Sequence, residues 1–155
     1  MYDKIWEEVK TLKENGIKVM ALLGGAAGVT YSKLNGTDDE FNAYYQPLLA
    51  LLKRKKKHNL DGLDIYIEEK VSISVPLRLI NALYQDLGPS SILTMAPLAA
   101  ALSDKDGSNL SGFSYFTLDT LTTIPCTTSS PFNLISFYNV QFYSGFARSL
   151  STKAS

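Results

Sequence analysis

The sequence has almost none of the residues that build disulfide bonds or zinc sites. It holds one cysteine, Cys126, and one histidine, His58, among 155 residues. A single cysteine cannot form an intrachain disulfide, and the two residues together cannot supply the ligands of a zinc site. A Ser-His-Asp catalytic triad would have to use His58, because the sequence has no other histidine. These two scarcities exclude the disulfide-rich domains and the zinc-binding modules.

The sequence also lacks an excess of charge and a long apolar run. Lys and Arg number 15 and Asp and Glu number 15, whereas nucleic-acid-binding proteins usually have a basic excess. No stretch reaches the roughly 18 consecutive apolar residues of a membrane span. The acidic start at residues 1–8 does not resemble a secretory signal. We therefore expect no nucleic acid and no membrane among the partners.

Apolar residues make up 45% of the chain, which is enough for a packed core and excludes disorder as the main state. Segments with helical spacing of apolar residues alternate with short apolar runs. The predicted helices are 3–15, 38–57, 76–87 and 115–120, and the predicted strands are 17–23, 61–69, 91–96 and 134–143. This alternation predicts an α/β fold with a parallel sheet.

The predicted strand 61–69 carries acidic side chains on one face. Residues 64, 66 and 68 lie on that face, while Leu63, Ile65 and Ile67 lie on the other and suit packing under helices. Carboxylates on a buried parallel strand are costly unless they are paired or functional. Either these acids end a strand and meet water, or they form part of an active site at the strand's C-terminal end.

Four segments, in order along the chain, resemble glycoside hydrolase family 18, the chitinase-type (β/α)8 barrels. The segment Asp61–Glu68 resembles the family motif D-G-x-D-x-D-x-E and matches it at Asp61, Gly62, Asp64 and Glu68. The segments Lys18–Gly25, Leu93–Pro97 and Asn139–Ser144 resemble the third, fifth and sixth strands. The best likeness is to the hevamine-like branch and its fungal members. The resemblance implies a partial TIM barrel with about strands three to six.

The resemblance implies a catalytic role for three residues. Glu68 would protonate the glycosidic oxygen, Asp64 would help to set the charge balance beside it, and Tyr143 would orient the N-acetyl group of the substrate. Enzymes of this family use no carboxylate nucleophile, because the N-acetyl carbonyl of the substrate attacks the anomeric carbon. The implied substrate-binding residues are Gln141, Gly24, Gly25, Tyr66 and Met95. No metal and no cofactor is implied.

One position of the motif departs from the family. Tyr66 stands where the family has its third Asp, which holds the N–H of the substrate's N-acetyl group. A phenol stays neutral near pH 7 and its ring would fill part of the sugar pocket. The loss of such a transition-state contact commonly lowers the rate by about 10²–10³. Alternatively, Tyr66 simply packs, with its hydroxyl bonded to Asp64 or Glu68.

The chain is short for this fold, because a complete barrel takes about 250 residues. The family's last strand brings a Trp to the sugar site, and Trp6, in the first predicted helix, cannot be that residue. We expect residues 1–148 to form a partial catalytic domain and residues 149–155 a disordered tail. Two exposed edge strands would favour self-association.

Three hypotheses for the function stay open. The chain is a chitinase-type hydrolase of β-1,4-linked N-acetylglucosamine polymers, weakened by Tyr66 and by its missing strands. Alternatively, it is a non-catalytic relative that binds such sugars, or a non-functional fragment. The expected partner is chitin or another polysaccharide that contains N-acetylglucosamine.

Overall fold

The computed structural model describes residues 3–26, 28, 30–53, 60–103, 106–125 and 130–142. Its helices are α1 (Asp3–Glu14), the short 3-10 helix η1 (Ser32–Leu34), α2 (Asp38–Leu52), α3 (Ser74–Leu87), α4 (Ala99–Ser103) and α5 (Tyr115–Thr122). Its strands are β1 (Met20–Gly24), β2 (Gly62–Tyr66), β3 (Ile92–Met95), β4 (Thr123–Ile124), β5 (Phe132–Asn133) and β6 (Phe137–Tyr138). Within these ranges no helix is both long and apolar enough to span a bilayer.

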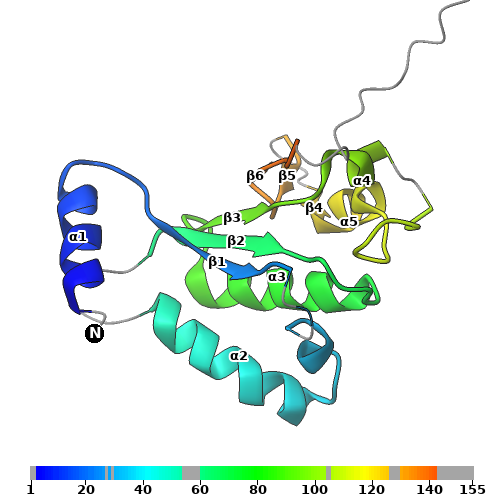
Figure 1. Cartoon of the computed structure of the whole chain (residues 1–155), viewed down its shortest axis with the longest axis horizontal. Coiled ribbons are helices and arrows are strands. Elements are labelled where there is room, and N and C mark those ends of the chain that lie inside the picture. Colours follow the sequence, from blue (N-terminus) through cyan, green and yellow to red (C-terminus); the bar gives the residue numbers. More distant parts are fainter. Residues whose placement is uncertain are drawn as a thin grey trace, which may run out of the picture.

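The main sheet has four strands in the order β1-β2-β3-β6, and every neighbouring pair is parallel. Helices α2 and α3 lie on the same side of this sheet (Figure 1). Helix α5 packs beside α3, and β4 and β5 form a small antiparallel pair. A parallel sheet that carries its connecting helices on one side is the arrangement of a (β/α)8 barrel. The predicted fold class, a partial TIM barrel, is confirmed.

The register divides the side chains of the sheet into two rows on opposite faces. One row consists of Leu22, Asp64, Thr94 and Phe137, and the next consists of Leu23, Ile65, Met95 and Tyr138. In the second row Ile65 and Met95 have no exposed surface and belong to the core under the helices. The first row therefore lies on the face that a closed barrel turns inward.

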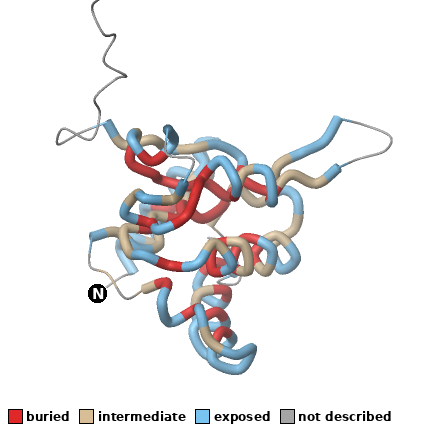
Figure 2. Tube along the Cα trace, turned by 90° about the vertical axis from the view of Figure 1, so that its right-hand side faces the viewer, coloured by how far each residue is buried: buried red, intermediate tan, exposed pale blue. Residues whose placement is uncertain are grey.

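The helices cover the sheet with apolar stripes. Helix α2 begins with a capping box between Thr37 and Glu40, and its buried residues Phe41, Tyr45 and Leu49 recur at helical spacing. Helix α3 likewise buries Leu79, Ile80 and Leu83. Figure 2 shows that the buried residues gather in the strands and in the helix surfaces turned toward them. The core thus lies between the sheet and the helices, as the alternation along 61–69 predicts.

Two glycines permit close approach between neighbouring strands. A Cβ on Gly62 would lie 1.7 Å from the carbonyl oxygen of Ile92, so no side chain fits there. A Cβ on Gly24 would lie 2.1 Å from the carbonyl oxygen of Tyr66, and Gly24 also has a φ of +97°. The glycine of the D-G motif is therefore a packing requirement between β2 and β3.

Several predicted boundaries are wrong by a few residues. Strand β1 begins at Met20 rather than at residue 17, and β2 ends at Tyr66 rather than at residue 69. Helix α3 begins at Ser74, so that Pro76 lies within its first turn instead of opening it. Helix α2 ends at Leu52, and most of the predicted remainder lies outside the described residues.

The predicted strand 134–143 is shortened to Phe137–Tyr138, with one further bridge between Leu98 and Gln141. Its partner β3 is only 4 residues long, and Pro97 just after β3 has no N–H to donate. Leu134 and Ile135 are neighbours in the chain and both are buried. In a strand with one covered face, neighbouring side chains would alternate between buried and exposed. Helix α4, η1 and the β4-β5 pair were not predicted.

Candidate functional site

The candidate site lies at the C-terminal end of β2. Asp64 is in the strand, Tyr66 is its last residue, and Glu68 follows two residues later. Asp64 is 8% exposed, whereas Tyr66 and Glu68 are partly exposed. A side chain just beyond the carboxyl end of a barrel strand points toward the mouth, where active sites form. The structure therefore places these three residues along the C-terminal end of β2.

Two side chains from other parts of the chain hold the carboxyl group of Asp64. The hydroxyl of Thr94 in β3 donates to its Oδ1 at 2.6 Å. The amide of Asn139, just after β6, donates to its Oδ2 at 3.3 Å. Burial of a carboxyl group is tolerated when its oxygens are hydrogen-bonded. Asp64 is thus fixed in place across three strands.

Tyr66 contacts the carboxyl group of Glu68 directly. Its phenol hydroxyl donates a hydrogen bond to Oε1 of Glu68. The backbone of Tyr66 is held as well, because the N–H of Gly25 donates to its carbonyl oxygen at 3.0 Å. A Cβ on Gly25 would lie 3.5 Å from the Tyr66 ring, so this glycine faces the phenol. The prediction that the Tyr66 hydroxyl bonds to Asp64 or Glu68 is confirmed for Glu68.

Of the remaining predicted residues, the structure describes Gln141 and Met95 but not Tyr143. Gln141 is partly buried and its amide donates to the carbonyl oxygen of Ala96 at 2.7 Å, beyond the end of β3. Met95 has no exposed surface and lies in the row of Ile65, on the face opposite to Asp64, which disagrees with its predicted place in a sugar site. Tyr143 lies outside the described residues.

A buried tyrosine supports the segment that carries Glu68. The hydroxyls of Tyr115 and Ser111 are 2.9 Å apart, and Ser111 also donates to the carbonyl oxygen of Ile67 at 2.7 Å. Burial raises the pKa of Tyr115 to about 12; its hydrogen bond with Ser111 acts in the opposite direction, and the negative charge of Glu68 adds to the rise. Tyr115 therefore stays neutral and fixes the backbone next to Glu68.

The second glutamate of the segment has a structural contact instead. Oε1 of Glu69 accepts from the N–H of Tyr31 at 2.6 Å, and Oε2 accepts from the N–H of Ser32 at 3.3 Å. The hydroxyl of Tyr31 in turn donates to the carbonyl oxygen of Leu23. Glu69 thus ties the start of η1 to the end of β2, and it shapes the loop that follows β1.

Asp61, the first residue of the motif, lies at the opposite end of β2. Its carboxylate accepts from Lys13 at 2.7 Å, from the N–H of Val19 at 2.8 Å and from Lys18 at 3.3 Å. Partial burial by itself raises the pKa of Asp61, but these three hydrogen bonds outweigh it and hold the pKa below 3.8. Asp61 joins α1, β1 and β2 and is far from the chemistry implied for Glu68.

Sequence reasoning missed the two partners of Asp64. Thr94 occupies the same row as Asp64, and the period-two alternation of the predicted strand 91–96 would have placed it there. Asn139 begins a segment that the family resemblance had already singled out, but its side chain was given no role. The sequence therefore pointed to both residues. Only the pairing of the strands shows that their side chains reach Asp64.

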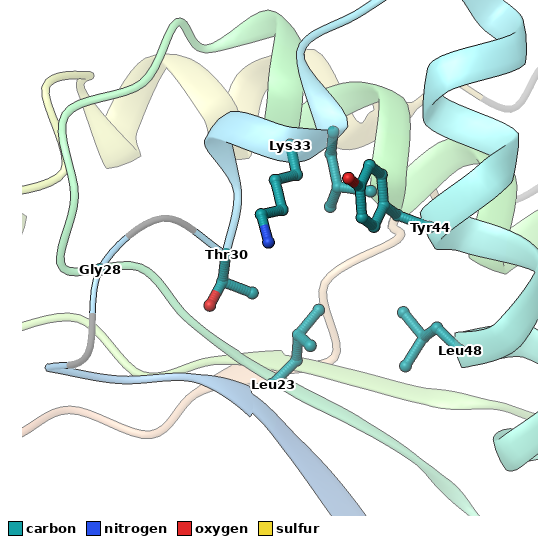
Figure 3. Close-up of a pocket in the computed structure, with 7 residues that line it drawn as sticks. Leu23, Gly28, Thr30, Lys33, Tyr44 and Leu48 are labelled. Carbon is teal, nitrogen blue, oxygen red and sulfur yellow. The ribbon is translucent and has the colours of Figure 1, made fainter.

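The cavity drawn in Figure 3 lies elsewhere, beside β1 and α2. It has a volume of about 340 Å³ and includes Leu23, Lys33, Tyr44 and Leu48 in its lining. None of the predicted site residues lines it. In the part of the chain that the structure describes, no three His, Cys, Asp or Glu side chains gather as metal ligands.

Comparisons with known proteins agree with this geometry. A chitinase from Aspergillus fumigatus is 46% identical, with a TM-score of 0.79, over 94% of this chain and 47% of that one. A fungal endo-β-N-acetylglucosaminidase of glycosyl hydrolase family 18 is 38% identical, with a TM-score of 0.79 and the same two coverages. At 21% identity, a Streptomyces coelicolor chitinase shares the fold, with a TM-score of 0.67. No protein-family model and no curated protein matches the sequence.

The parallel sheet and its helices define the fold class, a partial (β/α)8 barrel. The carboxyl groups of Asp64 and Glu68 lie at the end of the sheet where such barrels place their active sites. The chain spans 47% of the length of the two fungal structures. It belongs to glycoside hydrolase family 18, as a chitinase-like, partial member.

Proposed function

We propose that the chain is part of a chitinase-type glycoside hydrolase that acts on β-1,4-linked N-acetylglucosamine polymers with retention of configuration. The observation that carries the proposal is the set of Asp64, Tyr66 and Glu68 at the C-terminal end of β2, within a chain 46% identical to a fungal chitinase. In this proposal Glu68 is the general acid, and Tyr143 and Gln141 contact the N-acetyl group of the substrate.

The proposed reaction needs one protein acid and no protein nucleophile. Glu68 gives its proton to the glycosidic oxygen while the bond between that oxygen and the anomeric carbon breaks. The carbonyl oxygen of the substrate's N-acetyl group forms the new bond to the anomeric carbon from the other face. Water then attacks the anomeric carbon while the bond between that carbon and the N-acetyl oxygen breaks, and Glu68 takes a proton from the water. This restores the acid, and two successive inversions retain the configuration.

Tyr66 lowers the turnover in this proposal. Its hydroxyl occupies one oxygen of Glu68, and its ring lies between Gly25 and that carboxyl group. A neutral phenol cannot share a proton with neighbouring carboxyl groups as the family's third Asp does, and it takes space that a sugar would use. The loss expected from one missing transition-state contact is about 10²–10³ in rate.

The release of reducing ends from colloidal chitin tests the proposal. Glu68→Gln should abolish the release, whereas Glu8→Gln, an exposed site on α1, should not change it. Tyr66→Asp should raise the release about 10²–10³-fold. Tyr66→Phe separates the two effects of the tyrosine, because it keeps the ring and removes only the hydroxyl. Unchanged release by Glu68→Gln would contradict the proposed role of Glu68.

A second candidate function is sugar binding without cleavage, and the hydrogen bond from Tyr66 to Glu68 favours it. In that case the chain is retained on chitin beads but releases no reducing ends, and Tyr66→Asp does not change this. A folded chain, judged by its circular dichroism, that neither binds nor cleaves chitin would contradict both candidates.

A further inference from the structure

We propose that a hollow in the rim of the barrel mouth, outside the site around Glu68, holds one N-acetylglucosamine unit of the polymer. This site rests on the proposed function, because it takes the polymer that is proposed as the substrate. The hollow has a volume of about 510 Å³, within the range of about 300–1,000 Å³ that small-ligand sites occupy. Its lining includes Ser32, Asn35, Lys70, Ser72, Gly107 and Gly112.

The hollow lies between three loops that follow consecutive strands of the main sheet. Ser32 and Asn35 lie in η1 and directly after it, beyond β1; Lys70 follows β2; the two glycines lie between α4 and α5, beyond β3. Figure 1 shows these segments at the end of the sheet to which the arrowheads of β1 and β2 point. The hollow thus shares this end with Glu68, which is two residues before Lys70. Because described loops bound it on both sides of the β2 segment, its walls do not depend on the edges of the sheet.

Hydrogen bonds from a buried serine hold one wall of the hollow in place. The carbonyl oxygen of Ser111 accepts from the N–H of Val71 at 3.0 Å, and the hydroxyl of Ser111 donates to the carbonyl oxygen of Ile67 at 2.7 Å. Gly112 lets the two segments approach, because a Cβ there would lie 3.2 Å from the Cα of Lys70 and its φ is +78°. A wall that is already ordered costs little entropy when a ligand binds.

The polar side chains of the lining are available to a ligand. Within the described part of the chain, the hydroxyl of Ser32, the amide of Asn35 and the ammonium of Lys70 form no hydrogen bond and no ion pair with the protein. The hydroxyl and the amide can both donate and accept, and the ammonium only donates. A sugar unit with hydroxyls and an N-acetyl amide needs both kinds of partner. The buried Val71, also in the lining, offers an apolar contact for the N-acetyl methyl group.

The charges around the hollow favour a neutral ligand over an anion. The carboxylate of Glu69 lies directly beside the lining, because it accepts from the N–H of Ser32 at 3.3 Å and from the N–H of Tyr31 at 2.6 Å. Its negative charge offsets the positive charge of Lys70, the next residue in the chain, so a phosphate or a carboxylate would gain little attraction here. A neutral sugar unit does not meet this repulsion.

Chemical-shift mapping of the backbone amides by NMR tests the proposal. The probe is chitotriose, the trimer of N-acetylglucosamine, and the titration uses Glu68→Gln so that the trimer is not cleaved. The amides of Ser32, Asn35 and Lys70 should shift together as the trimer is added. The same spectra show whether each variant is folded.

Two substitutions in the hollow and one control give the comparison. Asn35→Ala and Lys70→Ala, each added to Glu68→Gln, should weaken the binding at the hollow about fivefold, the effect of one lost hydrogen bond. Lys33→Ala is the matched control. Lys33 also belongs to η1, but its Nζ lies 5.5 Å from the centre of the Tyr44 ring and it lines the other cavity (Figure 3). This variant should bind the trimer as tightly as Glu68→Gln does.

The pattern of shifts separates this proposal from the proposed function. Shifts at the hollow that Lys70→Ala weakens and Lys33→Ala leaves unchanged support it, whether or not the amides near residue 68 also move. Shifts confined to residues 64–68 overturn it and leave the proposed function intact, whereas no shifts at either place contradict both. Equal weakening by Lys33→Ala would place the trimer elsewhere. If inorganic phosphate shifts the amides of the hollow and the trimer does not, the hollow is an anion site and the proposal is wrong.

Discussion

The carboxyl group of Asp64 depends on donors from two other strands, and Thr94 supplies the shorter of the two hydrogen bonds, at 2.6 Å. Thr94→Val keeps the shape of the side chain and removes the donor. Because Asp64 is buried, we expect the free energy of unfolding to fall by about 2 kcal/mol. Urea denaturation measures this change. Thr120→Val is the control, since Thr120 is exposed and bonds only within its own helix. Equal losses in both variants would contradict the role given to Thr94.

Alternation along one strand predicted the residue-scale arrangement correctly. It placed Leu63, Ile65 and Ile67 under the helices, and all three are buried. Met95 was misplaced because its role came from the family resemblance, whereas the same alternation would have put it with Ile65. The contact between Asn139 and Asp64 joins residues 75 positions apart, and no local pattern contains it. Local periodicity thus predicts which side chains of one strand share a face. Only the pairing of the strands shows which side chains of different strands contact each other.

The first residue of the motif acts at the scale of elements, because Asp61 ties α1 and β1 to β2. Its hydrogen bonds favour the carboxylate and hold its pKa in the folded chain below 3.8. The folded state therefore binds fewer protons than the unfolded state near that pH. The resulting stability is present above about pH 4. It is lost as the pH falls through the lowered pKa.

This argument predicts the pH dependence of one variant. Asp61→Asn removes the ion pairs with Lys13 and Lys18, so the free energy of unfolding at pH 7 should fall by about 2 kcal/mol. The difference from the parent chain should shrink when urea denaturation is repeated at pH 3. Glu7→Gln, an exposed substitution on α1, should show no such change between the two pH values. A constant difference between pH 7 and pH 3 would mean that the charge of Asp61 contributes nothing.

At the scale of elements the helices were predicted better than the ends of the strands. The regular apolar stripe of helix α2 predicted its type, and the structure shows that Thr37 caps its start. Strand ends depend on hydrogen-bond partners that lie far away in the chain. The run 134–143 is mostly apolar, but β3 offers it a partner over 4 residues only. The length of β6 is therefore set by β3, and its own composition does not reveal it.

The strands that the structure describes form about half of a barrel wall. A closed parallel barrel has no edge, whereas the sheet formed by the described residues ends at β1 and at β6. The exposed Leu22 and Phe137 follow from that geometry, because a residue built to face a barrel interior meets water when the opposite wall is absent. Sequence length and motif order predicted the half barrel, but the row that joins these two residues became visible only with the register.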